Sequence, residues 1–288
     1  MIRVVVLGSA ASVPSPERNL PSVALAYNGN VYLFDCGEGT QRQMMKFGVS
    51  YAKVKAIFIS HLHLDHVLGM FGLMETLKLI GRTEPLYVFG PKGIAEMVGK
   101  RALVVVKEID DKFEYREEGF TVSAFRTNHM AHGSFGFVFE EDEKRRFHEK
   151  EAKALGIQGK LFTEIQQKGS LTLNGKKIKL EDVTYVQKGK KIVYSGDTAF
   201  CKDLVSASKG ADLLIHEATF ADDKAEEAKE RRHSTVSDAV KACQQAKAKQ
   251  LLLVHTSNRY EKDGGAEKEL KKAMPSARVA HDGLELLI

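Results

Sequence analysis

Residues 61–66 read His-Leu-His-Leu-Asp-His and directly follow the apolar run Ala-Ile-Phe-Ile at residues 56–59 and Ser60. The hexapeptide therefore places four potential metal ligands at the end of a predicted buried strand. Imidazole nitrogens and carboxylate oxygens are the usual ligands of catalytic Zn²⁺, which leaves a coordination position open for water. A surface His cluster or a tag-like run has no reason to follow a buried strand. The hexapeptide predicts a catalytic metal site.

The spacing within the hexapeptide suits two neighbouring metal ions. Successive side chains of an extended segment point to opposite sides, so His61 and His63 can share one face. We expect Asp65 to continue that row, and His66 to be redirected where the chain turns into the following helix. His61 and His63 are therefore assigned to one metal, and Asp65 and His66 to the other.

Length and composition indicate an ordinary globular α/β protein. The 288 residues suffice for one large domain or two small ones. No run approaches the roughly 20 apolar residues of a membrane span, and the N-terminus lacks the pattern of a signal peptide. Three cysteines, Cys36, Cys201 and Cys243, argue against a disulfide framework. We expect a cytoplasmic enzyme with no membrane partner.

Positive charge is concentrated in one segment of the chain. Between Lys144 and Lys191, 13 Lys and Arg residues stand against 5 Asp and Glu residues, although the net charge of the whole chain is only +5. Such a segment is typical of a polyanion contact, but a solvated Lys-rich insert explains the charge equally well. Because it is also rich in glycine and poor in long apolar runs, we expect an arm at about 141–191 that has no core of its own.

Short β-rich apolar runs alternate with amphipathic stretches outside this segment. Ser234 or Thr235 is a plausible N-cap for one of the helices. Strands are predicted at 2–7, 22–27, 31–35, 55–59, 86–89, 121–125, 135–139, 192–195, 212–216 and 251–254. Helices are predicted at 38–47, 67–80, 91–100, 201–208, 235–247 and 266–273.

Further metal ligands are expected where other strands end. His129 follows the strand 121–125, Asp197 lies in the turn after 192–195, and His255 follows 251–254. Ends of several strands meet in one cleft of an α/β fold, and a carboxylate such as Asp197 can bridge two cations. Taken singly, each residue could instead be a cap or a hydrogen-bonded structural group. His132 competes with His129, which is preferred because it lies closer to the strand end.

Several motifs are more specific than these ligands. They are Leu7-Gly8-Ser9 with Pro14 and Arg18-Asn19, the run Phe-Asp-Cys-Gly-Glu-Gly-Thr-Gln at 34–41, His-Glu-Ala-Thr at 216–219, His-Ser-Thr at 233–235 and His-Thr-Ser-Asn-Arg-Tyr at 255–260. With the metal ligands, they make the chain resemble the metallo-β-lactamase fold and, within it, the ribonuclease Z family. The resemblance covers nearly the whole chain.

The resemblance implies an α/β fold, an αββα sandwich of two mixed sheets flanked by helices, with residues 1–288 as one catalytic domain. It also implies a protruding basic arm at about 141–191 that binds tRNA, and a homodimer. The family's arm usually carries a Gly-Pro motif, whereas residues 156–161 here read Gly-Ile-Gln-Gly-Lys-Leu. Two Zn²⁺ ions per subunit, with Mn²⁺ as a substitute, are expected on His61, His63, Asp65, His66, His129, Asp197 and His255.

The family resemblance further implies an endoribonuclease that removes the 3′ trailer from precursor tRNA, leaving a 3′-OH on the tRNA and a 5′-phosphate on the trailer. Asp65 would ligate a metal and orient or deprotonate the attacking water, or act as a ligand only. His233, oriented by Glu217, would protonate the leaving 3′ oxygen, although an exposed His at a helix start is the plainer interpretation of His233 alone. Phosphate contacts are expected from Arg18, Asn19, Ser257 and Arg259. For Arg259, a structural ion pair is an equal alternative.

Two other classes of function compete with this one. One is a hydrolase of the same fold that acts on small phosphodiesters, sulfate esters, thioesters or lactams. The other is a metal-dependent RNA-binding protein without turnover. The basic segment and the His-Ser-Thr motif favour the endoribonuclease over the first. The complete set of seven ligands disfavours the second.

Overall fold

The computed structural model describes residues 1–131 and 133–288, so His132, the competitor of His129, lies outside the described residues. The chain divides into two compact units. Unit 1 comprises Met1–Glu140 and Lys191–Ile288, and unit 2 comprises Glu141–Lys190. None of the described helices is long and apolar enough to cross a membrane.

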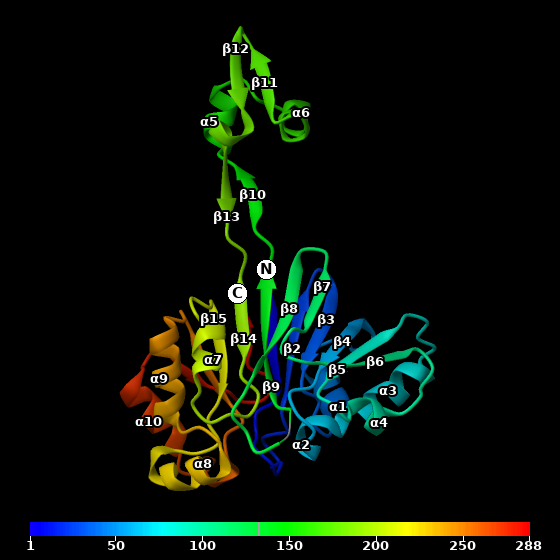
Figure 1. The fold of residues 1–288 in the computed structure, drawn as a ribbon, viewed down its shortest axis with the longest axis vertical. Coiled ribbons are helices and arrows are strands. Elements are labelled where there is room, and N and C mark those ends of the chain that lie inside the picture. The colour runs from blue at the N-terminus through cyan, green and yellow to red at the C-terminus, as the bar shows by residue number, and fades with distance from the viewer. Residues whose placement is uncertain (132) are drawn as a thin grey trace. The chain divides into compact units, whose positions relative to one another are not determined.

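Unit 1 contains two seven-stranded mixed sheets (Figure 1). The first has the order β18-β1-β2-β3-β4-β5-β6, and the second has the order β17-β16-β15-β14-β9-β8-β7. The strands of the first are β1 (Arg3–Gly8), β2 (Ser22–Tyr27), β3 (Asn30–Phe34), β4 (Val54–Phe58), β5 (Leu86–Gly90), β6 (Val104–Glu108) and β18 (Glu285–Leu287). Those of the second are β7 (Glu114–Glu117), β8 (Phe120–Arg126), β9 (Phe135–Glu141), β14 (Lys191–Tyr194), β15 (Leu213–Glu217), β16 (Leu251–Val254) and β17 (Arg278–Val279).

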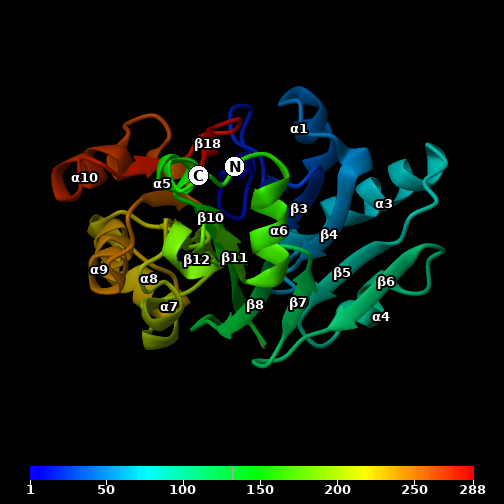
Figure 2. The same ribbon diagram turned by 90° about the horizontal axis from the view of Figure 1, so that it is seen from above.

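Helices cover the outer face of each sheet (Figure 2). Apolar residues of α1, α3 and α4 pack on the first sheet, and those of α7, α9 and α10 pack on the second. The helices of unit 1 are α1 (Thr40–Lys46), α2 (Leu64–Val67), α3 (Gly69–Leu79), α4 (Ile94–Val98), α7 (Lys202–Ala207), α8 (Ala225–Arg231), α9 (Val236–Ala246) and α10 (Gly265–Ala273). The expected arrangement of two mixed sheets flanked by helices is confirmed.

The alternation of side chains along the strands builds this layered core. In β1, Val4 and Val6 point into the apolar layer shared by the two sheets, while Val5 and Leu7 point toward the helices. Strand alternation requires this division, and it explains why the central strands are apolar on both faces. All ten predicted strands and six predicted helices occur, with ends shifted by a few residues. The four edge strands were not predicted, namely β6 and β18 of the first sheet and β7 and β17 of the second, and none of their residues is buried. The short helices α2 and α8 were not predicted either.

Two glycines let the segment that contains the hexapeptide lie against the turn after β3. A Cβ on Gly69 would lie 1.8 Å from the Gly37 carbonyl oxygen, and one on Gly37 would lie 2.6 Å from the Asp65 carbonyl oxygen. Backbone hydrogen bonds from Cys36 N to His66 O and from Gly69 N to Cys36 O close the contact. Glycine is required at both positions because any side chain would push α2 away from the turn.

Unit 2 has a small apolar core, and the expectation of an arm without a core was wrong. Its elements are β10 (Lys144–Phe147), α5 (Glu149–Ala154), α6 (Lys160–Lys168), β11 (Ser170–Leu173), β12 (Lys176–Lys179) and β13 (Thr184–Gln187). β10 pairs with β13, and β11 pairs with β12. Single apolar residues from most of these elements cluster together, namely Ala152, Ile157, Ile165, Leu171, Ile178 and Val183. They are isolated in the sequence, so no apolar run indicates them.

Candidate metal centre

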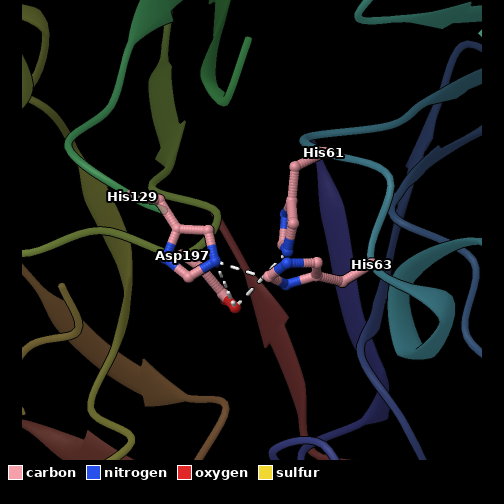
Figure 3. Close-up of side chains that lie close together, drawn as sticks. All are labelled: His61, His63, His129 and Asp197. Atoms are coloured by element: carbon pink, nitrogen blue, oxygen red, sulfur yellow. Dashed lines mark hydrogen bonds and ion pairs between the residues drawn. The ribbon is translucent and has the colours of Figure 1, made fainter. Parts of the chain in front are cut away.

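His61, His63, His129 and Asp197 turn their side chains toward one point between the two sheets (Figure 3). His61 and His63 lie in the segment after β4, His129 follows β8, and Asp197 follows β14. One ligand atom from each residue lies within 4.8 Å of the corresponding atoms of the others. The ends of three strands thus bring residues far apart in the sequence to a single cluster.

Asp65, His66 and His255 form a second cluster within the same distance. The prediction that Asp65 continues the row of His61 and His63 was wrong. The chain enters α2 at Leu64, so Asp65 and His66 both lie on the first turn of a helix. The helical turn separates these two side chains from the extended pair, and the hexapeptide still divides between two clusters.

One carboxylate oxygen, Oδ2 of Asp197, lies at the centre of both clusters. Its distances to imidazole Nε2 atoms are 3.7 Å for His61, 3.4 Å for His66, 4.0 Å for His129 and 3.4 Å for His255. Two atoms bound to one tetrahedral zinc ion lie about 3.3 Å apart, since zinc–nitrogen and zinc–oxygen bonds are about 2.0–2.2 Å long. The spacing fits ions between Asp197 and the imidazoles better than it fits direct hydrogen bonds.

Three of the four Nε2 atoms that face this point lack hydrogen-bond partners among the described residues, and the fourth, Nε2 of His129, lies 3.3 Å from His63 Nδ1. The Nε2 atoms of His61, His66 and His255 are buried and have no partner among the described residues. Buried polar atoms are normally satisfied, so three such nitrogens around one carboxylate call for a bound cation. Burial lowers the pKa of His61, His63 and His129, which favours the neutral imidazoles that metals bind. The residues present therefore fit two metal ions.

A buried carboxylate, Asp35, holds the imidazole of His66. Asp35 accepts hydrogen bonds from the Ser60 amide at 2.7 Å, from the Ser60 hydroxyl at 2.8 Å and from the Tyr194 hydroxyl at 2.7 Å. His66 Nδ1 lies 2.7 Å from Asp35 Oδ2, the oxygen that also accepts from the two hydroxyls. Because a carboxylate only accepts, Nδ1 of His66 carries a proton, and Nε2 is the nitrogen that faces the cluster and can bind a metal.

Ser60 extends the same arrangement to His61. The Ser60 hydroxyl donates its one hydrogen bond to Asp35. Its oxygen therefore accepts a hydrogen bond from His61 Nδ1, which lies 3.0 Å away. The proton on Nδ1 leaves the Nε2 of His61 free to bind a metal. A single carboxylate thus orients two ligands, one from each cluster.

His233 and Glu217 lie beside the metal clusters as a hydrogen-bonded pair. His233 Nδ1 lies 2.8 Å from Glu217 Oε1, and Glu217 is fully buried. Burial alone would lower the pKa of His233, but the charge and hydrogen bond of Glu217 outweigh it and raise that pKa to about 9. His233 is therefore protonated on both ring nitrogens, and so positively charged, at neutral pH. One possible ligand atom of His233 also lies within 4.8 Å of the corresponding atoms of Asp197 and His255.

The four residues expected to bind phosphate all contact other protein groups. Arg18 forms an ion pair with Glu267 at 3.2 Å, and the Asn19 side chain donates to the Glu38 carbonyl. Arg259 forms an ion pair with Glu227 at 3.2 Å. Its Nε donates to the Ser257 hydroxyl, and its guanidinium lies over the Phe220 ring.

Several polar residues that support the ligands have no role predicted from the sequence. Asp35 and Thr219 belong to the motifs at 34–41 and 216–219, Ser60 precedes the hexapeptide, and Tyr194 lies in the predicted strand 192–195. Their contacts join different strands, so no local spacing reveals them. A buried polar residue directly after an apolar strand is the one signal that could have identified Asp35 and Ser60.

Comparisons with known proteins agree with this geometry. Residues 18–146 match the family described as the Metallo-beta-lactamase superfamily, and residues 175–256 match the Beta-lactamase superfamily domain. The metallo-beta-lactamase fold protein YhfI from Bacillus subtilis superimposes with a TM-score of 0.74 at 17% identity, covering 99% of this chain and 98% of that one. A likeness at that identity shows the fold alone.

Relatives with higher identity are more specific. The short form of human tRNase Z superimposes with a TM-score of 0.70 at 29% identity and covers 99% of both chains. Ribonuclease Z from Pyrococcus horikoshii is 37% identical, covering 98% of this chain and 94% of that protein. Ribonuclease Z from Ignicoccus hospitalis is 38% identical over 296 residues, covering 99% of this chain and 98% of that protein. The chain belongs to the ribonuclease Z family of the metallo-β-lactamase superfamily.

Proposed function

We propose that this chain removes the 3′ trailer from precursor tRNA with two Zn²⁺ ions, leaving a 3′-OH on the tRNA and a 5′-phosphate on the trailer. The observation that carries this proposal is the convergence of four imidazole Nε2 atoms on Oδ2 of Asp197 in a member of the ribonuclease Z family. Mn²⁺ is the expected substitute for Zn²⁺. The cytoplasmic location expected from the sequence stays a prediction.

The two metal ions would divide the ligands between them. His61, His63 and His129 would hold one ion, Asp65, His66 and His255 would hold the other, and Asp197 would bridge both. Zinc supplies Lewis acidity, which lowers the pKa of water and neutralises charge on the phosphoryl oxygens.

Asp65 is proposed to orient the attacking water and to accept its proton. Its Oδ2 accepts a hydrogen bond from the Ser12 amide at 3.1 Å. Burial alone would raise the pKa of Asp65, but His255 and His66 outweigh it and lower that pKa. The carboxylate is therefore ionised at neutral pH and available as a proton acceptor.

His233 is the general acid of the proposed reaction. Its Nδ1 is held by Glu217, so its Nε2 is the atom left to deliver a proton to the leaving 3′ oxygen. Glu217 keeps its own orientation through hydrogen bonds from the Thr198 and Thr219 amides, each 2.9 Å long. The pair thus holds a proton ready at a fixed place beside the metal clusters.

Unit 2 is proposed to bind the body of the tRNA. Its exposed Lys and Arg side chains are available to contact the phosphates of a nucleic-acid backbone, and such contacts do not require a deep binding site. These side chains are those of Arg145, Arg146, Lys150, Lys153, Lys160, Lys168, Lys176, Lys177, Lys179 and Lys188. Of Arg18, Asn19, Ser257 and Arg259, the two arginines are proposed to reach phosphate by exchanging their carboxylate partners for it.

A homodimer is proposed as the assembly, as the family resemblance implies. Exposed apolar side chains in and beside α2 and α3 are candidates for the contact, since Leu64 and Leu68 are 61% and 40% exposed and Leu79 is 78% exposed. Met45 of α1 is also 54% exposed.

Replacing His233 by Ala should lower kcat for precursor tRNA by about 10²- to 10⁴-fold, because the leaving 3′ oxygen loses its proton donor. Hydrolysis of bis(p-nitrophenyl) phosphate should fall far less, because p-nitrophenolate leaves without protonation. Steady-state kinetics on both substrates measures the difference. His281→Ala, which removes an exposed histidine outside the metal clusters, is the matched control.

Equal losses on both substrates would contradict the assignment of His233 as the acid. So would the loss of a bound metal ion from His233→Ala, which would make His233 a ligand. Good turnover of the small diester by the unaltered protein, with no cleavage of precursor tRNA, would instead favour a small-molecule hydrolase.

Replacing both Lys176 and Lys177 by Glu should raise KM for precursor tRNA by on the order of 10-fold and make binding less sensitive to salt. These residues are exposed on β12, so the core of unit 2 should be preserved. Hydrolysis of bis(p-nitrophenyl) phosphate should be unchanged. The control replaces Lys271 and Lys272, exposed on α10, with the same change of charge. Equal effects of the two double variants would show that unit 2 has no special role.

Replacing Leu68 by Glu should convert the dimer to a monomer, because a charge would be buried at the proposed interface. Sedimentation velocity on the unaltered protein and on the variant measures the change. Leu287→Glu, at a 59% exposed position on β18, should leave the dimer intact. A monomeric unaltered protein, or a dimeric Leu68→Glu variant, would refute the assignment of this face.

A further inference from the structure

We propose that Thr219 is a positioning residue that sets the tautomer of His255 and so directs its Nε2 at the metal cluster. This inference rests on the proposed metal site. Thr219 follows β15 and is only 6% exposed. Its hydroxyl oxygen lies 2.8 Å from Glu217 Oε2 and 2.8 Å from His255 Nδ1. It therefore stands between the carboxylate of the acid pair and a metal ligand.

The direction of each hydrogen bond follows from a count of protons. The Glu217 carboxylate can only accept hydrogen bonds, so the single O–H of Thr219 donates to its Oε2. With that proton used, the Thr219 oxygen can only accept from His255. The Nδ1 atom of His255 must then be the protonated nitrogen. The opposite assignment would place the lone pairs of Thr219 and Glu217 against each other at 2.8 Å.

This tautomer leaves the other nitrogen of His255 ready for a metal. Within the described part of the chain Nε2 of His255 is buried without a hydrogen-bond partner, and it lies 3.6 Å from Asp65 Oδ2 and 3.4 Å from Asp197 Oδ2. A proton on Nε2 would prevent coordination there. Hydrogen bonds to the far nitrogen of a metal-binding histidine fix the ring and its tautomer in this way.

Ser60 makes the same arrangement on the opposite side of the centre, between Asp35 and His61. Thr219 differs because its hydroxyl also lies 3.2 Å from Nδ1 of His233. A change at Thr219 should nevertheless spare Glu217, since the backbone amide of Thr219 still donates to Oε2 at 2.9 Å. The main effect should therefore fall on the metal ligand His255.

The test compares Thr219→Val, which keeps the shape and removes the hydroxyl, with Thr219→Ser, which keeps the hydroxyl. Thr256→Val is the matched control, because its hydroxyl is buried beside the same histidine and has no partner among the described residues. Each protein is loaded with Zn²⁺, and metal retention is measured by competition with a coloured chelator. Thr219→Val should hold one of its two ions about 10- to 100-fold more weakly. Thr219→Ser and Thr256→Val should match the unaltered protein.

Retention of both ions by Thr219→Val at unaltered affinity would overturn the proposal, whatever its cleavage rate. Equal weakening in Thr256→Val would also overturn it, because packing rather than the hydroxyl would then be the cause. If Thr219→Val does not fold, Thr219→Ala replaces it, since it only removes atoms. The metal-retention assay needs no RNA. Failure of the unaltered protein to cleave precursor tRNA would therefore refute the proposed function without affecting the result for Thr219.

Discussion

Four imidazole nitrogens are held around one carboxylate oxygen, and elements from both sheets keep them there. The Nε2 atoms of His61, His66, His129 and His255 all face Oδ2 of Asp197 at 3.4–4.0 Å. Such a group of buried polar atoms is costly unless a cation binds among them. The two sheets, the turn after β3 and the helix α2 all contribute to keeping these side chains in place.

The supporting residues follow one physical rule on both sides of the centre. A buried carboxylate accepts a hydrogen bond from a hydroxyl, and that hydroxyl accepts one from the Nδ1 of a histidine proposed to bind a metal. Asp35 and Ser60 do this for His61, and Glu217 and Thr219 do it for His255. Because each carboxylate also contacts a further histidine, His66 or His233, the metal clusters and the proposed acid share one network.

The sequence was most informative where chemistry and strand ends coincide. His61, His129, Asp197 and His255 each follow a strand, so an apolar run ending in a ligand residue was enough to bring them together. Asp65 was misplaced within the hexapeptide, because the onset of α2 at Leu64 depends on backbone contacts with the turn after β3. The supporting hydroxyls and the core of unit 2 were missed, since both arise from contacts between separate elements. Neither has a local pattern in the sequence.

The most direct test of the metal centre is a crystal structure of the natively purified protein with anomalous diffraction measured above and below the zinc absorption edge. Two peaks should appear, one beside His61, His63 and His129 and the other beside Asp65, His66 and His255, with Oδ2 of Asp197 between them. A single peak, or ions bound away from Asp197, would contradict a centre of two metal ions that share Asp197.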